Sequence, residues 1–157
     1  MFRIASAPLE PDALRGELSA TGAGGVVTFE GRVRSQNAGR EVCSLDYEAY
    51  GGLAEKEGAR ILAEAREKFG LCSAWCVHRV GHLRAGEIAV WVGVGAAHRG
   101  SAFDACRFIV DEMKRRVPIW KKEHYAGGAA AWISHPAEGA DHPPASTQSA
   151  RVSGTAR

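Results

Sequence analysis

The alternation of apolar and polar residues predicts where the strands of this chain lie. Leu45, Tyr47 and Ala49 alternate with Asp46 and Glu48. A two-residue period is typical of a strand that buries one face. Residues 42–50 are therefore predicted to form a strand. The other predicted strands cover residues 2–5, 26–34, 71–80, 87–95, 119–123 and 130–134.

Three intervals have helical spacing instead. Residues 53–69 place Ile61, Ala65 and Phe69 four apart, and Gly70 is expected to end that helix. Residues 11–20 begin with proline and are predicted to form a second helix. The third, at 102–116, follows Ser101 in a pattern that resembles a capping box. Its expected buried residues are Phe103, Cys106, Ile109, Val110 and Met113.

The order of these elements predicts the fold class. Helices separated by pairs of strands are typical of an α+β fold with a largely antiparallel sheet. Residues 135–157 contain one valine and no Leu, Ile, Met or aromatic residue. Such a segment cannot bury enough apolar surface to offset its conformational entropy. We therefore predict one domain over residues 1–134 and a disordered C-terminal tail over residues 135–157.

Charge and composition exclude several classes of protein. The chain of 157 residues has 20 Lys and Arg against 18 Asp and Glu, a net charge of +2. This balance provides no overall positive field for nucleic acid or membrane surfaces. No apolar run approaches the roughly 18 residues of a membrane span, and the N-terminus lacks a signal-peptide core. We expect a cytoplasmic protein whose four cysteines are reduced.

Two segments could bind an anion. His98 and Arg99 precede a predicted helix, where free backbone N–H groups favour negative charge. The alternative is that His98 only ends a strand and Arg99 lies in solvent. Arg32 and Arg34 are expected on one side of the strand at 26–34, although paired surface arginines are more often only solvated.

The densest group of cations lies at residues 114–122, with five in nine residues. Cations there can offset the negative end of a helix or solubilise a strand edge. Lys121 is expected on the same strand face as Ile119, against apolar surface, so Lys114 and Lys121 are candidates for chemistry. An alternative function is phosphate or RNA binding by this cluster, with Trp120 as a stacking platform.

A metal site is not expected. The spacing of Cys72, Cys76, His78 and His82 resembles a zinc ligand set, but Cys72, Cys76 and His78 would lie along one extended strand, which is too linear for a tetrahedral site. Buried, unreactive thiols are the better interpretation of Cys72 and Cys76. The chain also lacks a phosphate-binding glycine loop and a serine nucleophile elbow.

Several short motifs follow one another along residues 2–134. They are VVTFEGRVR at 26–34, YEAY at 47–50, HRVG at 78–81, GE at 86–87, AHR at 97–99 with AF at 102–103, and Lys114 followed by PIWKKE at 118–123. The most specific pair is H-R-x-x-A-F followed by K-x-x-x-P-I-W-K-K-E. In this order the motifs resemble those of the catalytic large subunit of molybdopterin synthase.

The resemblance implies an α/β-hammerhead fold and a sulfurtransferase of molybdenum cofactor biosynthesis. The enzyme would be a central homodimer within a heterotetramer, with a small ubiquitin-like subunit on each outer end. The C-terminal Gly-Gly thiocarboxylate of that partner would deliver sulfur to cyclic pyranopterin monophosphate (precursor Z), building the dithiolene of molybdopterin in two transfers. No cofactor or metal is required, because the sulfur arrives already activated.

The resemblance also implies roles for individual residues. Lys114 and Lys121 match the family's two important lysines and are expected to be catalytic. The expected substrate-binding residues are Phe29, Arg34, His98, Arg99 and Lys122.

Overall fold

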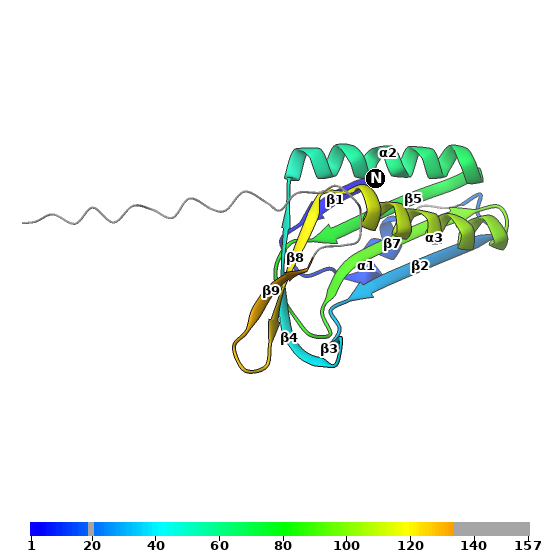
Figure 1. Ribbon diagram of the computed structural model, residues 1–157. Helices are drawn as coiled ribbons and strands as arrows, with labels where there is room; N and C mark the ends of the chain where they lie inside the picture. The colour runs from blue at the N-terminus through cyan, green and yellow to red at the C-terminus, as the bar shows by residue number, and fades with distance from the viewer. Residues whose placement is uncertain (19–20, 134–157) are drawn as a thin grey trace, which may run out of the picture.

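Two sheets organise the protein in the computed structural model, which describes residues 1–18 and 21–133 (Figure 1). The large sheet has the strand order β1-β5-β7-β2 and the small sheet the order β3-β4-β8-β9, with β6 also paired to β4. Only β1 and β5 pair in parallel among the pairs formed by these residues. The strands are β1 (Phe2–Ala5), β2 (Gly25–Arg32), β3 (Gln36–Asn37), β4 (Arg40–Ala49), β5 (Leu71–Arg79), β6 (Gly81–Arg84), β7 (Ile88–Ala96), β8 (Ile119–Tyr125) and β9 (Ala130–Ile133).

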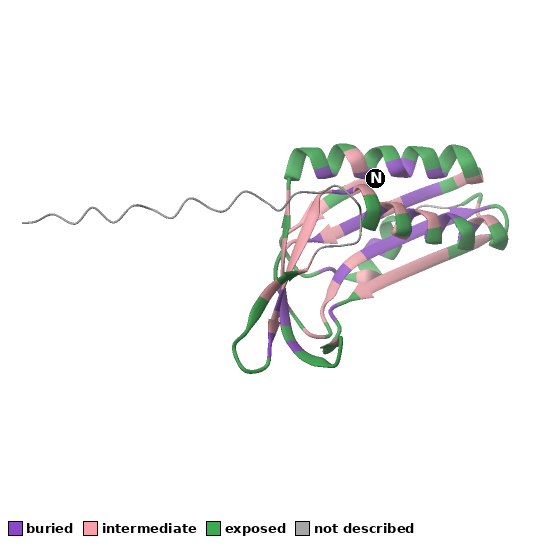
Figure 2. Cartoon of the chain, in the orientation of Figure 1, coloured by how far each residue is buried: buried purple, intermediate pink, exposed green. Residues whose placement is uncertain are grey.

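Helices cover both faces of the large sheet. The helices α2 (Gly51–Phe69) and α3 (Arg99–Arg116) lie side by side on one face (Figure 1). Their inward sides are buried and their outward sides exposed (Figure 2). Ile61 and Ile109 of these helices pack with Val92 in the main core. The short helix α1 (Pro11–Glu17) covers the other face, where Leu14 packs with Trp91. The expected α+β class is confirmed.

The small sheet has a core of its own. Leu45 and Leu83 stand opposite each other on β4 and β6, and both are buried with Val42 and Tyr125. β4 is a long strand that extends beyond the large sheet, so most of the small sheet lies to one side of it (Figure 1). The C-terminal end of β4 lies beside the start of α2. The chain therefore folds around three packed clusters, two on the faces of the large sheet and one in the small sheet.

The structure corrects several sequence predictions. The segments 36–37 and 81–84, which lie between the predicted strands, form β3 and β6 because β4 offers them backbone partners. The helix expected at 102–116 begins at Arg99, and its N-cap His98 makes no side-chain capping bond, so the capping box at Ser101 is wrong. Phe103 was expected to be buried but is 63% exposed, because it lies on the outward side of α3.

Other predictions are confirmed in part. Gly70 ends α2 in the left-handed conformation with φ 62°, and Pro118 follows directly on the end of α3. α1 is described only to Glu17, with Leu18 as its cap, and residues 19–20 of the predicted helix lie outside the described residues. The predicted tail at 135–157 also lies outside them, so its predicted disorder and the domain limit at 134 stay predictions.

The cysteines divide into two classes. Cys76 and Cys106 are buried, whereas Cys43 and Cys72 are exposed, so the expectation of burial was wrong for Cys72. Burial raises the pKa of the Cys76 thiol to about 12 and that of Cys106 to about 11. All four are free thiols. No helix among the described residues is both long and apolar enough to cross a membrane.

Candidate active site

A cavity opens where α3 meets the large and small sheets. Its cavity volume is about 160 Å³. Its apolar lining is Phe29, Ala89, Val90, Val92, Val110, Met113, Val117 and Ile119, and its polar lining is Arg32, Tyr47, His78, Lys114 and Lys121. Among these lining residues the formal charges are all positive. A mostly apolar cavity with a few converging cations suits a flat ring system that carries negative charge.

Lys114 and Lys121 reach this cavity from two different elements. Lys114 lies in the last turn of α3, and Lys121 lies on β8. Between them Val117 caps the helix and Pro118 prevents its continuation, so the chain turns directly into β8. This turn brings both lysines to one cavity although they are seven residues apart. Lys121 was expected on the same strand face as Ile119. This prediction is confirmed, because both side chains line the cavity.

The two lysines have different surroundings. The Lys121 side chain is 16% exposed, and its ammonium nitrogen lies 3.6 Å from a carboxylate oxygen of Glu123. Lys114 is exposed, and no described carboxylate forms an ion pair with it. Lys121 is therefore held in place by a fixed counter-charge, while Lys114 keeps its charge available for an incoming group.

Glu123 anchors Lys121 from beneath the cavity. Its side chain is only 4% exposed and accepts hydrogen bonds from Asn37 Nδ2 at 2.9 Å and from the Tyr125 hydroxyl at 2.8 Å. Burial acts to raise the pKa of Glu123, but these two bonds and the Lys121 charge outweigh it, so the pKa lies below its ordinary value. Glu123 is consequently an ionised carboxylate with three partners.

Tyr47 and His78 form the aromatic part of the polar lining. Tyr47 stands opposite Lys121 in the register of β4 and β8. Its ring meets the His78 ring edge to face, with centroids 5.1 Å apart. Burial, together with the charge of Glu123, raises the pKa of Tyr47 to about 12. Tyr47 is therefore a neutral hydroxyl at neutral pH and can donate a hydrogen bond.

The strand β2 provides one arginine rather than two. The pairing of β2 with β7 shifts register between Gly31 and Arg32, and the strand ends there. Arg32 lines the cavity and pairs with Glu30 at 2.7 Å. Arg34 lies beyond the strand, exposed, and donates to Asn37 at 3.3 Å. The expectation that Arg32 and Arg34 share one strand face is wrong, because the bulge interrupts the alternation.

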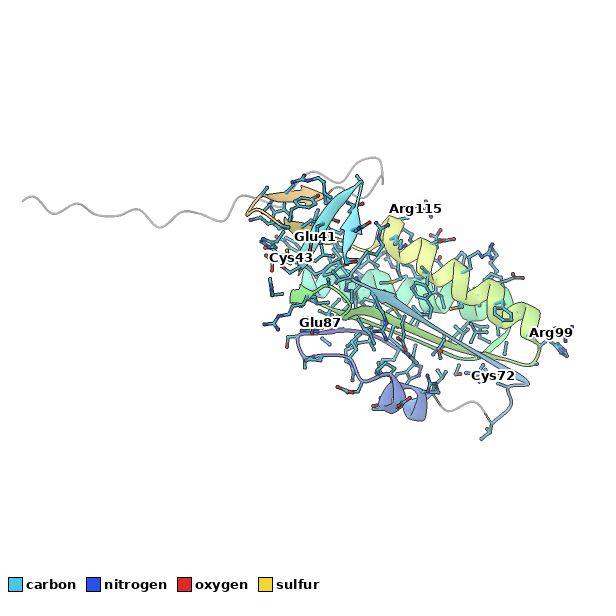
Figure 3. All side chains as sticks on the ribbon, turned by 90° about the horizontal axis from the view of Figure 1, so that it is seen from below. Glu41, Cys43, Cys72, Glu87, Arg99 and Arg115 are labelled. Carbon is cyan, nitrogen blue, oxygen red and sulfur yellow. The ribbon has the colours of Figure 1, made fainter. Side chains whose placement is uncertain are left out.

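His98 and Arg99 lie at the opposite end of α3 from Lys114. Figure 3 shows this separation, with Arg99 at one end of the helix and Arg115 at the other. The fifteen residues from Arg99 to Lys114 correspond to about 22 Å of helix. A separate hollow is lined by His98, Arg99, Gly24, Ala97 and Gly100. One chain therefore does not bring the two expected anion-binding groups together.

The remaining expected site residues are placed as follows. Phe29 lines the cavity, as the substrate-binding expectation requires. Lys122 is absent from the cavity lining, since successive strand residues point to opposite faces, and its ammonium group lies 5.8 Å from the centre of the Trp132 ring. Tyr47, His78 and Glu123 belong to motifs quoted above, but they were not predicted to lie in the active site. The alternation of Lys121 and Glu123 along β8 was a signal that could have identified Glu123.

Comparison with known proteins identifies the family. The family model described as MoaE protein matches residues 4–116. The chain belongs to the MoaE family. A molybdopterin synthase catalytic subunit from Pyrococcus abyssi is 49% identical over 106 residues, which are 68% of this chain and 72% of that protein. One from Nostoc sp. is 38% identical over 134 residues, 85% of this chain and 81% of that protein.

Solved structures of the MoaE family share the fold. The crystal structure of molybdopterin synthase from Staphylococcus aureus has a TM-score of 0.78 and 37% identity, covering 84% of this chain and 96% of that chain. The MoaE protein from Burkholderia ambifaria has a TM-score of 0.73 and 32% identity, covering 85% and 88%. The family resemblance expected from the motifs is confirmed, and with it a sulfur-transferring enzyme of molybdenum cofactor biosynthesis.

Proposed function

We propose that this MoaE-family chain transfers sulfur from the C-terminal thiocarboxylate of a small ubiquitin-like partner to precursor Z, and so forms the dithiolene of molybdopterin. The observation that carries the proposal is the convergence of Lys114 and Lys121 on one apolar cavity. Both the thiocarboxylate and the cyclic phosphate of the substrate are anions. A cavity whose charged lining is entirely cationic favours both.

The two lysines have different roles in each sulfur transfer. Attack by the thiocarboxylate sulfur forms a carbon–sulfur bond to the substrate and places negative charge on the substrate's leaving oxygen. Lys121, fixed by Glu123, is placed to stabilise that charge, since a preorganised cation needs no reorganisation during the reaction. Lys114, which has no described counter-ion, is placed to exchange a proton. Water then replaces the sulfur on the partner's carbonyl carbon, which leaves a carboxylate there.

The apolar lining and the neutral hydroxyl position the substrate. Phe29 offers an aromatic face beside the cavity, against which a pterin ring can stack. The Tyr47 hydroxyl can donate to a ring carbonyl because its raised pKa keeps it protonated. Arg32 adds a third cation to the lining, while Arg34 lies outside it and its contact with the phosphate stays a prediction.

His98 and Arg99 can join this site only from a second copy of the chain, because about 22 Å of helix separates them from Lys114. We include in the proposal a homodimer in which each cavity receives His98 and Arg99 of the other copy. The proposal also includes a heterotetramer, in which the homodimer binds two small subunits, and a cytoplasmic location. Phosphate or RNA binding by residues 114–122 finds no support: Lys114 and Lys121 line the cavity, Lys122 lies over the Trp132 ring and Arg116 pairs with Glu57.

The direct test combines the purified chain with a thiocarboxylated Gly-Gly partner and precursor Z. Product is measured as the fluorescent derivative of molybdopterin. Lys114→Ala and Lys121→Ala are each expected to lower the rate at least about a hundredfold, the usual cost of removing a preorganised charge. Arg115→Ala, next to Lys114 but 66% exposed and outside the cavity, is the matched control and should retain activity. Undiminished product from both lysine variants would refute the proposed chemistry.

Mixed dimers test the sharing of the site between copies. Lys114→Ala and Arg99→Ala chains, each inactive alone, are unfolded together and refolded. Random pairing gives one intact site in each mixed dimer, so about one quarter of wild-type activity should return. No recovery, with dimers formed normally, would show that Arg99 acts within its own chain or not at all.

A further inference from the structure

Three strands of the small sheet bring two histidines and an aspartate together on the face away from the cavity. Asp46 lies on β4, the middle strand of the three. His82 stands directly opposite Asp46 on β6. His124 on β8 stands opposite Ser44, two residues from Asp46, so it is a diagonal neighbour on the same face. Lys121 and Glu123, which alternate with His124, lie on the cavity side.

The contacts within this His82–Asp46–His124 cluster are short. His82 Nδ1 lies 2.7 Å from Asp46 Oδ1, and His124 Nε2 lies 2.5 Å from Asp46 Oδ2. The two imidazole rings are tilted toward each other with centroids 5.9 Å apart. One ligand atom from each residue lies within 4.8 Å of the others. The three side chains are between 33% and 58% exposed, so an ion can enter from solvent.

We propose that His82, Asp46 and His124 bind a divalent transition-metal ion of the zinc class. Two imidazoles and one carboxylate are a common set of three protein ligands, completed by water in an open position. Tetrahedral coordination at about 2.1 Å separates ligand atoms by about 3.4 Å. The ion would thus replace both hydrogen bonds, and the ligand atoms, which lie within 4.8 Å of one another, would reach this spacing by shifts of no more than about 1.4 Å.

The surroundings suit a bound cation. Asp46 places its carboxylate between the two imidazoles, with Oδ1 toward His82 and Oδ2 toward His124. Lys122 stands opposite Asp46 in register, but its ammonium group lies over the Trp132 ring, which gives that charge another partner. His82 also ended the series Cys72, Cys76, His78 and His82 that was not expected to bind metal, but here it is joined by Asp46 and His124, so the three ligands come from three strands.

Metal binding here would connect the strands that build the active site. Asp46 precedes Tyr47 on β4, and His124 lies three residues after Lys121 on β8. An ion shared by β4, β6 and β8 would therefore fix the register that places Tyr47 opposite Lys121. The ion takes no part in the sulfur transfer, since it lies on the opposite face of the sheet.

The test titrates the metal-free full-length chain, in a non-thiol reductant, with Zn²⁺ in a calorimeter. One equivalent should bind to the wild type, and Zn²⁺ should raise the midpoint of thermal unfolding. His82→Gln, His124→Gln and Asp46→Asn keep polar side chains of similar size, and each should weaken binding at least about tenfold. Chemical shifts of the imidazole nitrogens provide a local readout, which should move for His82 Nδ1 and His124 Nε2.

Two controls separate this site from other donors. Cys43→Ser removes an exposed thiol on the same strand β4, and a double variant of His135 and His142 removes the histidines outside the described residues. Both should bind Zn²⁺ as the wild type does. The proposal is overturned if the wild type binds no Zn²⁺, if the His82 and His124 variants bind it unchanged, or if only a control variant loses it.

Discussion

Arg116 connects the two helices that support the active site, and its replacement should be costly. Its guanidinium group donates to Glu57 at 2.7 Å, to both carboxylate oxygens of Glu64 at 2.6 and 2.9 Å, and to Glu112 at 3.1 Å. Glu57 and Glu64 belong to α2, whereas Glu112 and Arg116 belong to α3. The position of Lys114 in the last turn of α3 therefore depends on this ion-pair network.

The exposure of each partner sets the magnitude. Arg116, Glu57 and Glu112 are only 22%, 17% and 16% exposed, while Glu64 is 47% exposed. A hydrogen bond between charged groups is worth about 1.5–3 kcal/mol when sheltered. Counting only the bonds to Glu57 and Glu112, and allowing for solvent that relaxes around them, Arg116→Met should lower the free energy of unfolding by about 2–4 kcal/mol. That corresponds to a fall in Tm of about 5–15 °C.

Arg115→Met is the matched control, because Arg115 is 66% exposed and its ion pair among the described residues is with Glu112 on its own helix. It should cost less than about 0.5 kcal/mol. Urea denaturation followed by circular dichroism measures both variants, with unchanged m-values showing that the comparison is valid. Equal losses from the two variants would refute the argument, since it depends on the difference in burial.

The same network predicts how stability depends on pH. Hydrogen bonding to Arg116 holds the pKa of Glu64 below its ordinary value in the folded protein. A carboxyl whose pKa is lowered by folding stabilises the protein above its unfolded pKa, and that stability is lost as the pH falls through the folded pKa. The wild type should therefore lose stability in acid more steeply than Arg116→Met. Parallel acid profiles would contradict the assignment of this pKa shift to Arg116.

Two further predictions concern the core. Native protein should react with a thiol reagent at its two exposed cysteines only, because burial raises the pKa values of Cys76 and Cys106; four reactive thiols without denaturant would contradict this. Gly58→Ala should lower the free energy of unfolding by about 1–3 kcal/mol, because its new methyl group would overlap the ring of Phe2. Gly52→Ala lies on the same helix with no atom near its new methyl group, and it should raise the free energy of unfolding by up to about 1 kcal/mol. Thermal unfolding of both variants decides this prediction.

Residues whose burial follows a simple period were predictable from the sequence, and residues positioned by a partner strand were not. The alternation around Leu45 and the four-residue spacing of Ile61 and Ala65 describe faces that pack against the core. In contrast, β6 contains a single buried residue, Leu83, and becomes a strand because it pairs with β4. Intrinsic strand propensity cannot reveal such a pairing, since it depends on contacts with a strand that is distant in the sequence.

The candidate site divides in the same way. Lys121 could be placed against apolar surface because it alternates with Ile119 along a strand, whereas Lys114 was a candidate through the cation cluster and the family motif. The grouping of His98 and Arg99 with these lysines failed within one chain, and the sequence already contained the reason. A helix predicted over residues 102–116 is itself about 20 Å long. Groups at its two ends can share a site only if another copy supplies one of them.

The strand β8 shows how one short segment can carry two kinds of chemistry. Lys121, Glu123 and Tyr125 face the cavity side of the small sheet, and Lys122 and His124 face the other. Because side chains alternate along a strand, a slip of one residue would exchange the two faces. It would bury Lys122 and His124, and it would move Lys121 away from its cavity. The hydrogen bond to Glu123 from Asn37 of β3 opposes that slip, so the same buried carboxylate positions the lysine and helps to fix the register.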